Sequence, residues 1–268
     1  MTALNGSVAP LSPFDLVTAT GLVVAAGLVS LGLRLGLEKR LAIAAVRTVV
    51  QLLLVGYILR FVFDLNHPAP VVAIMLVMTF IAGHAAVQRV TRRFPGMLVY
   101  AFITLVLSGL ITTFVVTGLI IRVTPWRPQY AIPLLGMILG NGLTGISISL
   151  DLALESFAER RNEIEMELAL GATRWEAAQR PLRESVRRGM IPIINSMTVV
   201  GIVSLPGMMT GQILSNTDPL TAVKYQIVVM FMLAAATSLA CMLSTMIVFS
   251  RCFNARHQLR QGFITRKG

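Results

Sequence analysis

The dominant pattern in this sequence is a series of long, nearly uninterrupted apolar runs separated by short polar segments. A membrane-spanning helix needs about 20 mostly apolar residues. By that measure the sequence predicts seven spans, over residues 14–37, 41–63, 70–87, 97–121, 130–157, 189–214 and 223–249. Strands of membrane barrels are alternating segments of about 10 residues, which is half the length of these runs. We therefore expect an all-α, polytopic transmembrane helical bundle.

Positively charged residues gather in every second segment between these spans. Cytoplasmic loops are enriched in Lys and Arg, so we assign the following cations to the inner side: Arg34, Lys39, Arg40, Arg89, Arg92, Arg93, Arg160, Arg161, Arg174, Arg180, Arg183, Arg187, Arg188, Arg251, Arg256, Arg260, Arg266 and Lys267. The outer side would carry only Arg60, Arg122, Arg127 and Lys224. The pattern predicts an N-terminus outside and a C-terminus in the cytoplasm.

Composition and motifs exclude several classes of function. Charged residues make up 13% of the chain, against about 25% in soluble domains. The net charge of +11 comes from the inter-span clusters and not from a single basic face, so we expect no nucleic-acid partner. A phosphate-binding G-x-x-x-x-G-K-[ST] loop and the HEXXH and G-x-S-x-G motifs of hydrolases do not occur. We expect no catalytic residue and no cofactor bound by this chain.

The segment 158–188 is the one long polar stretch and forms a predicted cytoplasmic loop. Residues 163–170 favour a helix, which Gly171 can close in the left-handed conformation. Thr173 and Glu176 have the spacing of a capping box at the start of a second helix. Pro181 is expected to end or kink that helix. The prediction is a helix, a glycine turn and a short amphipathic helix along the membrane face, which could also rest on anionic lipid.

Two motifs resemble those of known permeases. The loop resembles the "EAA…G" segment with which ABC-transporter permeases dock on their ATP-binding subunit. Farther on, VGIVSLPGMMTGQ (200–212), Asp218-Pro219 and AVKYQ (222–226) resemble the FetB family of bacterial iron-export ABC permeases, to which plant aluminium-tolerance permeases are similar. Further agreement lies at Gln51-Leu52, Val55-Gly56-Tyr57, Gly136-Met137, Gly140-Asn141 and His257-Gln258-Leu259, so that the resemblance covers residues 37–259.

The resemblance implies a single transmembrane permease domain over residues 1–268, with 158–188 as its coupling loop, in a bacterial inner membrane. It implies export of iron or a related metal, driven by a separate ABC subunit that binds ATP and Mg. Two permeases would assemble with two such subunits. The residues expected to contact the ATP-binding subunit are Glu165, Glu167, Ala169, Gly171, Ala172 and Thr173.

Polar groups and helix breaks at membrane depth are candidates for the transport pathway or its gate. The candidates are Gln51, Asn141, Asn195, Pro206, Gly207, Met208 and Met209. Helix packing would equally explain the asparagines and the Pro-Gly break. The thioethers of the two methionines favour soft metals such as Cu(I) over ferrous iron. No set of metal ligands can be assigned from the sequence.

Two alternatives to an ABC metal exporter stay open. A secondary transporter or channel would work without ATP, but the buried carboxylates expected of one are missing, since Asp15, Asp64, Asp151 and Asp218 lie at or beyond the ends of the predicted spans. An ABC permease could also carry a non-metal substrate such as a nucleotide sugar.

Overall fold

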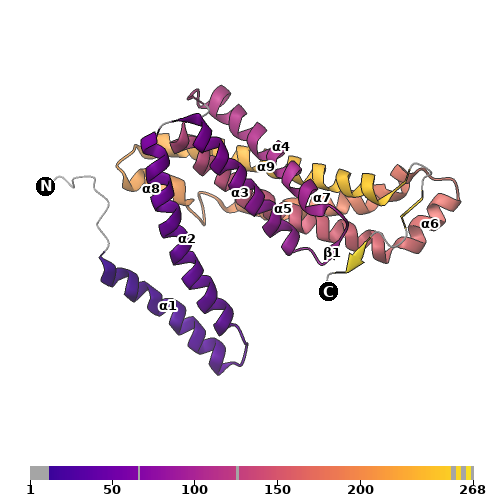
Figure 1. Cartoon of the computed structure of the whole chain (residues 1–268), viewed down its shortest axis with the longest axis horizontal. Helices are drawn as coiled ribbons and strands as arrows, with labels where there is room; N and C mark the ends of the chain where they lie inside the picture. Colours follow the sequence, from indigo (N-terminus) through magenta and orange to yellow (C-terminus); the bar gives the residue numbers. More distant parts are fainter. Residues whose placement is uncertain (1–11, 66, 125–126, 255–257, 261–263, 267–268) are drawn as a thin grey trace. The chain divides into compact units, whose positions relative to one another are not determined.

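The computed structural model describes residues 12–65, 67–124, 127–254, 258–260 and 264–266 (Figure 1). The inner-side cations Arg256 and Lys267 and the family-like His257 lie outside these residues. The helices are α1 (Pro13–Gly32), α2 (Glu38–Leu65), α3 (Pro68–Gln88), α4 (Met97–Val115), the π-helical turn η1 (Val116–Ile120), α5 (Pro128–Glu159), α6 (Arg161–Ala169), α7 (Arg174–Val199), α8 (Gly207–Leu214) and α9 (Pro219–Cys252). Two short strands, β1 (Arg92–Arg93) and β2 (Thr265–Arg266), pair antiparallel.

Six helical stretches in the described part of the chain are long and apolar enough to cross a membrane. They are Phe14–Gly32, Glu38–Asp64, Pro68–Gln88, Met97–Ile120, Pro128–Glu159 and Pro219–Cys252. The all-α prediction is confirmed, and each of these stretches overlaps one of the predicted spans. The remaining prediction, a span over 189–214, does not form one helix. That range holds the end of α7, a non-helical segment over 200–206 and the eight-residue α8.

The chain divides into two compact units. The first contains residues up to His67 together with 211–217, and the second contains 68–210 and the chain from Asp218 onward. In the first unit α1 and α2 form a helical pair. Ser12 and Asp15 form a capping box at the start of α1. Our prediction of one permease domain stays a prediction.

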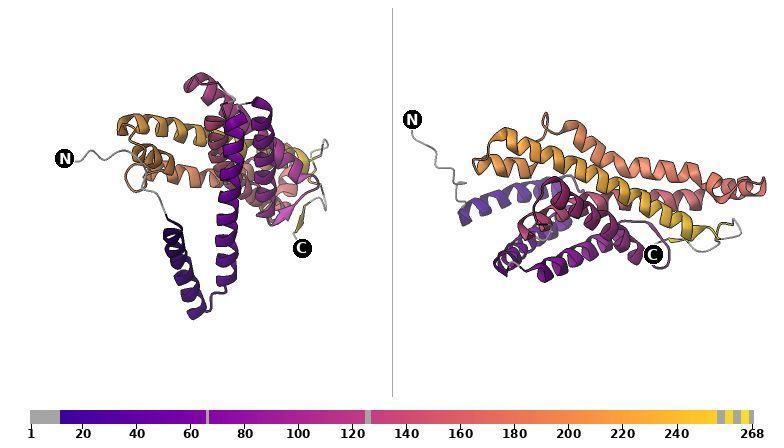
Figure 2. Two further views of the ribbon diagram at one scale, coloured as in Figure 1. Left: turned by 60° about the vertical axis from the view of Figure 1, so that its left-hand side comes forward. Right: turned by 90° about the horizontal axis from the view of Figure 1, so that it is seen from above.

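In the second unit, helices α5, α7 and α9 lie side by side (Figures 1 and 2). Glycine at their crossing lets the three backbones approach. A Cβ atom added at Gly145 in α5 would lie 2.8 Å from Thr237 Cγ2 and 2.9 Å from Cys241 Sγ, both in α9. A Cβ added at Gly189 in α7 would collide with Ser149 Oγ of α5. The crossing therefore depends on the absence of side chains at these two positions.

One end of the second unit gathers the segments that the charge pattern assigns to the inner side. Strand β2 of the C-terminal tail pairs with β1 in the loop after α3. The Thr91 N–H in that loop donates to Asp151 Oδ1 at 2.7 Å, and Arg92 Nη2 lies 3.8 Å from Glu159 Oε1. Asp151 thus lies about two turns inside α5, not at the helix end as we expected from the sequence. The carboxyl ends of α3, α5 and α9 therefore face the same way.

Candidate functional site

A tight turn joins α6 to α7 at Gly171. The Ala172 N–H donates to the Glu167 carbonyl at 3.0 Å, and the Gly171 N–H donates to the Leu168 carbonyl at 3.1 Å. These two bonds define a Schellman motif, with Gly171 at its left-handed position and a φ of +96°. An added Cβ would meet nothing within 4 Å, so the requirement for glycine is conformational and not steric. The predicted turn is confirmed.

The second helix starts at the predicted capping box. The Glu176 N–H donates to Thr173 Oγ1 at 3.3 Å, and the Thr173 N–H donates to Glu176 Oε2 at 2.7 Å. The bond from the Thr173 backbone holds the pKa of the Glu176 carboxyl below its ordinary value. Two backbone donors that the helix leaves unpaired are satisfied in this way. The position of the turn is therefore set locally, by residues on both sides of Gly171.

Ion pairs hold two of the three acidic residues of α6, Glu163 and Glu165. Arg161 Nε donates to Glu165 Oε1 at 2.8 Å, and Arg160 Nε donates to Glu163 Oε2 at 2.7 Å. The second bond holds the pKa of Glu163 below its ordinary value. The six predicted coupling residues lie on one continuous segment around the turn. Four of them are exposed and two are half-buried; in chain order the six are Glu165, Glu167, Ala169, Gly171, Ala172 and Thr173.

We expected Pro181 to end or kink the second helix, and the expected end is wrong. Helix α7 continues through Pro181 and Pro192 to Val199, over 26 residues. A proline inside a helix removes one hydrogen bond and crowds the preceding turn. Here Pro181 is buried, and α7 packs along both α5 and α9, so tertiary packing offsets that cost. The Gly171 turn is therefore followed by a long helix, and not by a short one along the membrane face.

Aromatic side chains tie the start of α7 to the end of α9. Trp175 packs edge-on against Phe249 at a centroid distance of 5.4 Å, and the Arg174 guanidinium lies 5.6 Å from the centroid of the same ring. Phe249 contacts Phe253, which packs edge-on against Phe157 of α5 at 5.6 Å. We did not identify this cluster from the sequence. The four-residue spacing of Phe249 and Phe253 was the available signal.

A pocket of about 420 Å³ lies toward the other end of α7 and α9. Its walls come from the end of α7, the non-helical 200–205 segment, α8 and the first turns of α9. The lining residues are Met197, Val200, Gly201, Leu205, Met209, Val223, Gln226, Ile227, Met230 and Phe231. Gln226 is only 7% exposed, and its Oε1 has no hydrogen-bond partner among the described residues. Gln226 belongs to the family-like AVKYQ motif, but we did not predict it as a site residue.

The structure separates the two methionines that we predicted as pathway residues. Met209 lines the pocket. Met208 instead packs against a cluster of buried apolar residues from η1, α5, α7 and α9. Pro206 and Gly207 lie at the start of α8, where the Pro206 carbonyl accepts the Thr210 N–H at 3.0 Å. The break that we predicted at Pro206-Gly207 is present, but it begins earlier, because α7 already ends at Val199 and helix resumes only at Gly207. The non-helical 200–205 segment borders the pocket.

The other three predicted pathway residues lie elsewhere. Asn141 Nδ2 donates to the Met137 carbonyl one turn back in α5, at 3.0 Å. Asn195 is exposed on α7, and Gln51 is exposed on α2 in the first unit. None of the three lines the 420 Å³ pocket. Their assignment to a pathway stays a prediction.

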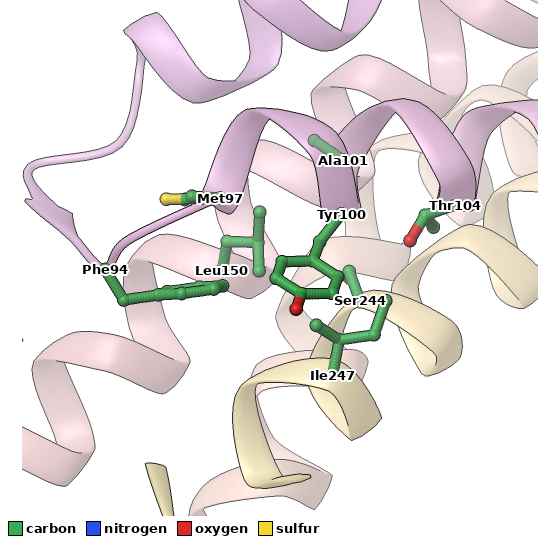
Figure 3. Close-up of a pocket in the computed structure, with 8 residues that line it drawn as sticks. All are labelled: Phe94, Met97, Tyr100, Ala101, Thr104, Leu150, Ser244 and Ile247. Atoms are coloured by element: carbon green, nitrogen blue, oxygen red, sulfur yellow. The ribbon is translucent and has the colours of Figure 1, made fainter. Parts of the chain in front are cut away.

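A second cavity lies beside Tyr100 and is too small for a transported ion with ligands. It encloses about 10 Å³, which is room for one water at most. Figure 3 shows its lining residues: Phe94, Met97, Tyr100, Ala101, Thr104, Leu150, Ser244 and Ile247. Thr104 Oγ1 is buried there without a hydrogen-bond partner in the described part of the chain. We interpret the cavity as a packing feature of α4, α5 and α9.

Comparison with known proteins identifies the family. The chain matches the family described as "Uncharacterised protein family (UPF0014)" over residues 13–253. This chain belongs to the UPF0014 family. It is 33% identical to "Probable iron export permease protein FetB" of Escherichia coli, over 91% of this chain and 93% of that protein. It is 31% identical to "Protein ALUMINUM SENSITIVE 3" of Arabidopsis thaliana, over 89% of this chain and 86% of the relative. No solved structure matches the chain.

The UPF0014 assignment confirms the resemblance inferred from the sequence. A further relative, the "UPF0014 membrane protein YjkA" of Bacillus subtilis, is 32% identical over 89% of this chain and 94% of its own length. Together with the apolar helices, these relatives identify this UPF0014 chain as a multi-pass membrane protein of a transport permease family.

Proposed function

We propose that this UPF0014 protein is the membrane-spanning permease subunit of an ABC transporter that exports iron or a related metal species. ATP and Mg would bind to a separate subunit, and this chain would carry no catalytic residue and no cofactor. The observation that carries the proposal is the Schellman turn at Gly171, which joins α6 to α7 in the middle of the predicted coupling segment. Similarity to the probable iron export permease of Escherichia coli supports metal export.

Exposed apolar side chains surround the turn and suit a protein partner. Leu170 is 82% exposed, Met166 is 58% exposed and Trp175 is 43% exposed. Exposed apolar groups bordered by charged ones are typical of interaction surfaces, and Glu165 and Arg161 provide such a border. An ATP-binding subunit that binds this segment would move α7 as a rigid body, because the helix is continuous to Val199.

Our proposed topology has seven crossings, with the N-terminus outside and the C-terminus in the cytoplasm of a bacterial inner membrane. The end of α7, the 200–206 segment and α8 together would make the sixth crossing. Two observations support it: the carboxyl ends of α3, α5 and α9 face the same way, and the cationic segments that follow these three helices lie at that end of the second unit. Two permeases would pair with two ATP-binding subunits, as the family resemblance implies.

Co-purification tests the proposal. The permease would be expressed with a candidate ABC ATPase from the same genome, purified in detergent and reconstituted into liposomes. We expect a stable complex whose ATP hydrolysis drives iron accumulation in inside-out vesicles. Full transport by the permease alone, with no binding to the ATPase, would contradict the ABC assignment and favour a secondary transporter or channel.

The pocket chemistry argues against a nucleotide sugar. A diphosphate is bound by cationic side chains or by clustered backbone N–H groups at helix N-termini. The residues that line the pocket carry no Lys or Arg side chain. Iron accumulation in cells that lack the protein separates the two substrates, because a nucleotide-sugar permease would leave cellular iron unchanged.

A further inference from the structure

The 420 Å³ pocket combines three thioethers with one amide oxygen. Met197 comes from α7, Met209 from α8, and Met230 and Gln226 from α9. These four side chains are far apart in sequence, and the fold brings them to one pocket. The Gln226 residue is 93% buried and its Oε1 lacks a hydrogen-bond partner. A buried acceptor without a donor is costly, so a bound cation that this oxygen coordinates would be stabilised.

The donor set determines which group fits. Thioethers are soft ligands that select Cu(I), whereas carboxylates and imidazoles suit iron. No three His, Cys, Asp or Glu side chains among the described residues are placed to hold a metal ion. The lining residues also carry no formal charge. Because the cost of burying an ion rises steeply with its charge, neutral ligands favour a monovalent cation over a divalent one.

We propose that this pocket binds a soft monovalent cation of the copper(I) or silver(I) class through Met197, Met209, Met230 and Gln226. Methionine has three rotatable bonds, and the open volume of about 420 Å³ leaves room for the sulfur atoms to turn toward one ion. The cation would link α7, α8 and α9 where the non-helical 200–205 segment borders the pocket. As a transport step the site rests on the proposed export function, whereas binding itself does not.

Silver(I) binding to the purified full-length chain tests the site without ATP or a partner. The lining variant combines Met197→Leu, Met209→Leu and Met230→Leu, which nearly conserve volume. The control variant combines Met190→Leu, Met208→Leu and Met232→Leu, which come from the same three helices but do not line the pocket. Loss of outer-shell groups alone weakens metal sites roughly 10- to 100-fold, so loss of three direct ligands should weaken silver(I) binding at least 100-fold.

Isothermal titration calorimetry gives the affinities, and X-ray absorption at the silver edge reports sulfur neighbours. We expect the control variant to bind like the natural chain, and the lining variant to lose both affinity and sulfur neighbours. Equal binding by the two variants would overturn the site. Displacement of silver(I) by stoichiometric iron(II) would overturn the proposed preference of the pocket for soft cations. Because no ATPase is present, either failure leaves the proposed ABC coupling untouched and is distinguishable from its failure.

Discussion

Trp175 at the start of α7 and Phe249 near the end of α9 pack edge-on, with ring centroids 5.4 Å apart and planes at 83°. The contact joins the proposed coupling turn to the helix that also carries Met230 and Gln226. Phe249 and Met230 are 19 residues apart (249 − 230), which is roughly 28 Å along a helix. A displacement of the turn by a bound partner can therefore be transmitted to the pocket along α9 as well as along α7.

Loss of this contact should weaken coupling without unfolding the protein. We predict that Trp175→Ala lowers the metal transported per ATP hydrolysed, because aromatic pairs contribute about 0.5–1.5 kcal/mol beyond simple burial. Trp175 is 43% exposed, so the variant should still fold and insert. The measurement is the ratio of transport to hydrolysis in proteoliposomes with the partner ATPase. Trp175→Phe keeps an aromatic edge and should restore most of the ratio; equal ratios for all three proteins would exclude this route.

Gly171 offers a test of the turn itself. We predict that Gly171→Val uncouples hydrolysis from transport, because a φ of +96° is strongly disfavoured for a β-branched residue and left-handed backbone costs about 1–2 kcal/mol for residues with a Cβ. Gly171→Asn is the matched control, since Asn tolerates left-handed backbone better than other side chains. No neighbour lies within 4 Å of the added Cβ, so any difference between the variants reports backbone conformation. Full coupling in the Val variant would remove the turn from the docking mechanism.

The crossing of α5, α7 and α9 predicts a difference between two glycines of one helix. Gly145→Ala should lower the free energy of unfolding by about 1–3 kcal/mol, the usual cost of overpacking, because its Cβ would lie 2.8 Å from Thr237 Cγ2 and 2.9 Å from Cys241 Sγ. Gly140→Ala meets nothing within 4 Å and should be neutral or slightly stabilising. The measurement is the Tm of each purified variant in detergent. Similar Tm values for the two variants would show that the helices cross less closely than described.

Local features of this chain were predictable from sequence, and features made by tertiary packing were not. The capping box of Thr173 and Glu176 and the turn at Gly171 depend on neighbours within five residues, so their spacing sufficed. The break expected at Pro181 failed because contacts of α7 with α5 and α9 outweigh one lost hydrogen bond. Gln226 was overlooked as a site residue because its burial and missing partner exist only once α9 packs beside α7 and α8.

Gln226 should show opposite effects on stability and on binding. We predict that Gln226→Leu raises the free energy of unfolding by about 1 kcal/mol, because it removes a buried acceptor that lacks a partner, while silver(I) affinity falls. Gln226→Met should give the same gain in stability but retain affinity, since a fourth thioether replaces the amide oxygen.

Thermal unfolding and silver(I) titration of the same preparations separate two roles for this side chain. If Gln226 only packs against its neighbours, the Leu and Met variants should bind silver(I) equally. If it is a ligand, they should differ in affinity while agreeing in Tm. A loss of stability in both variants would show that the carboxamide is satisfied within the protein, and its oxygen would then not require a bound cation. The two variants thus distinguish a ligand from a packing residue at the one polar group of the pocket.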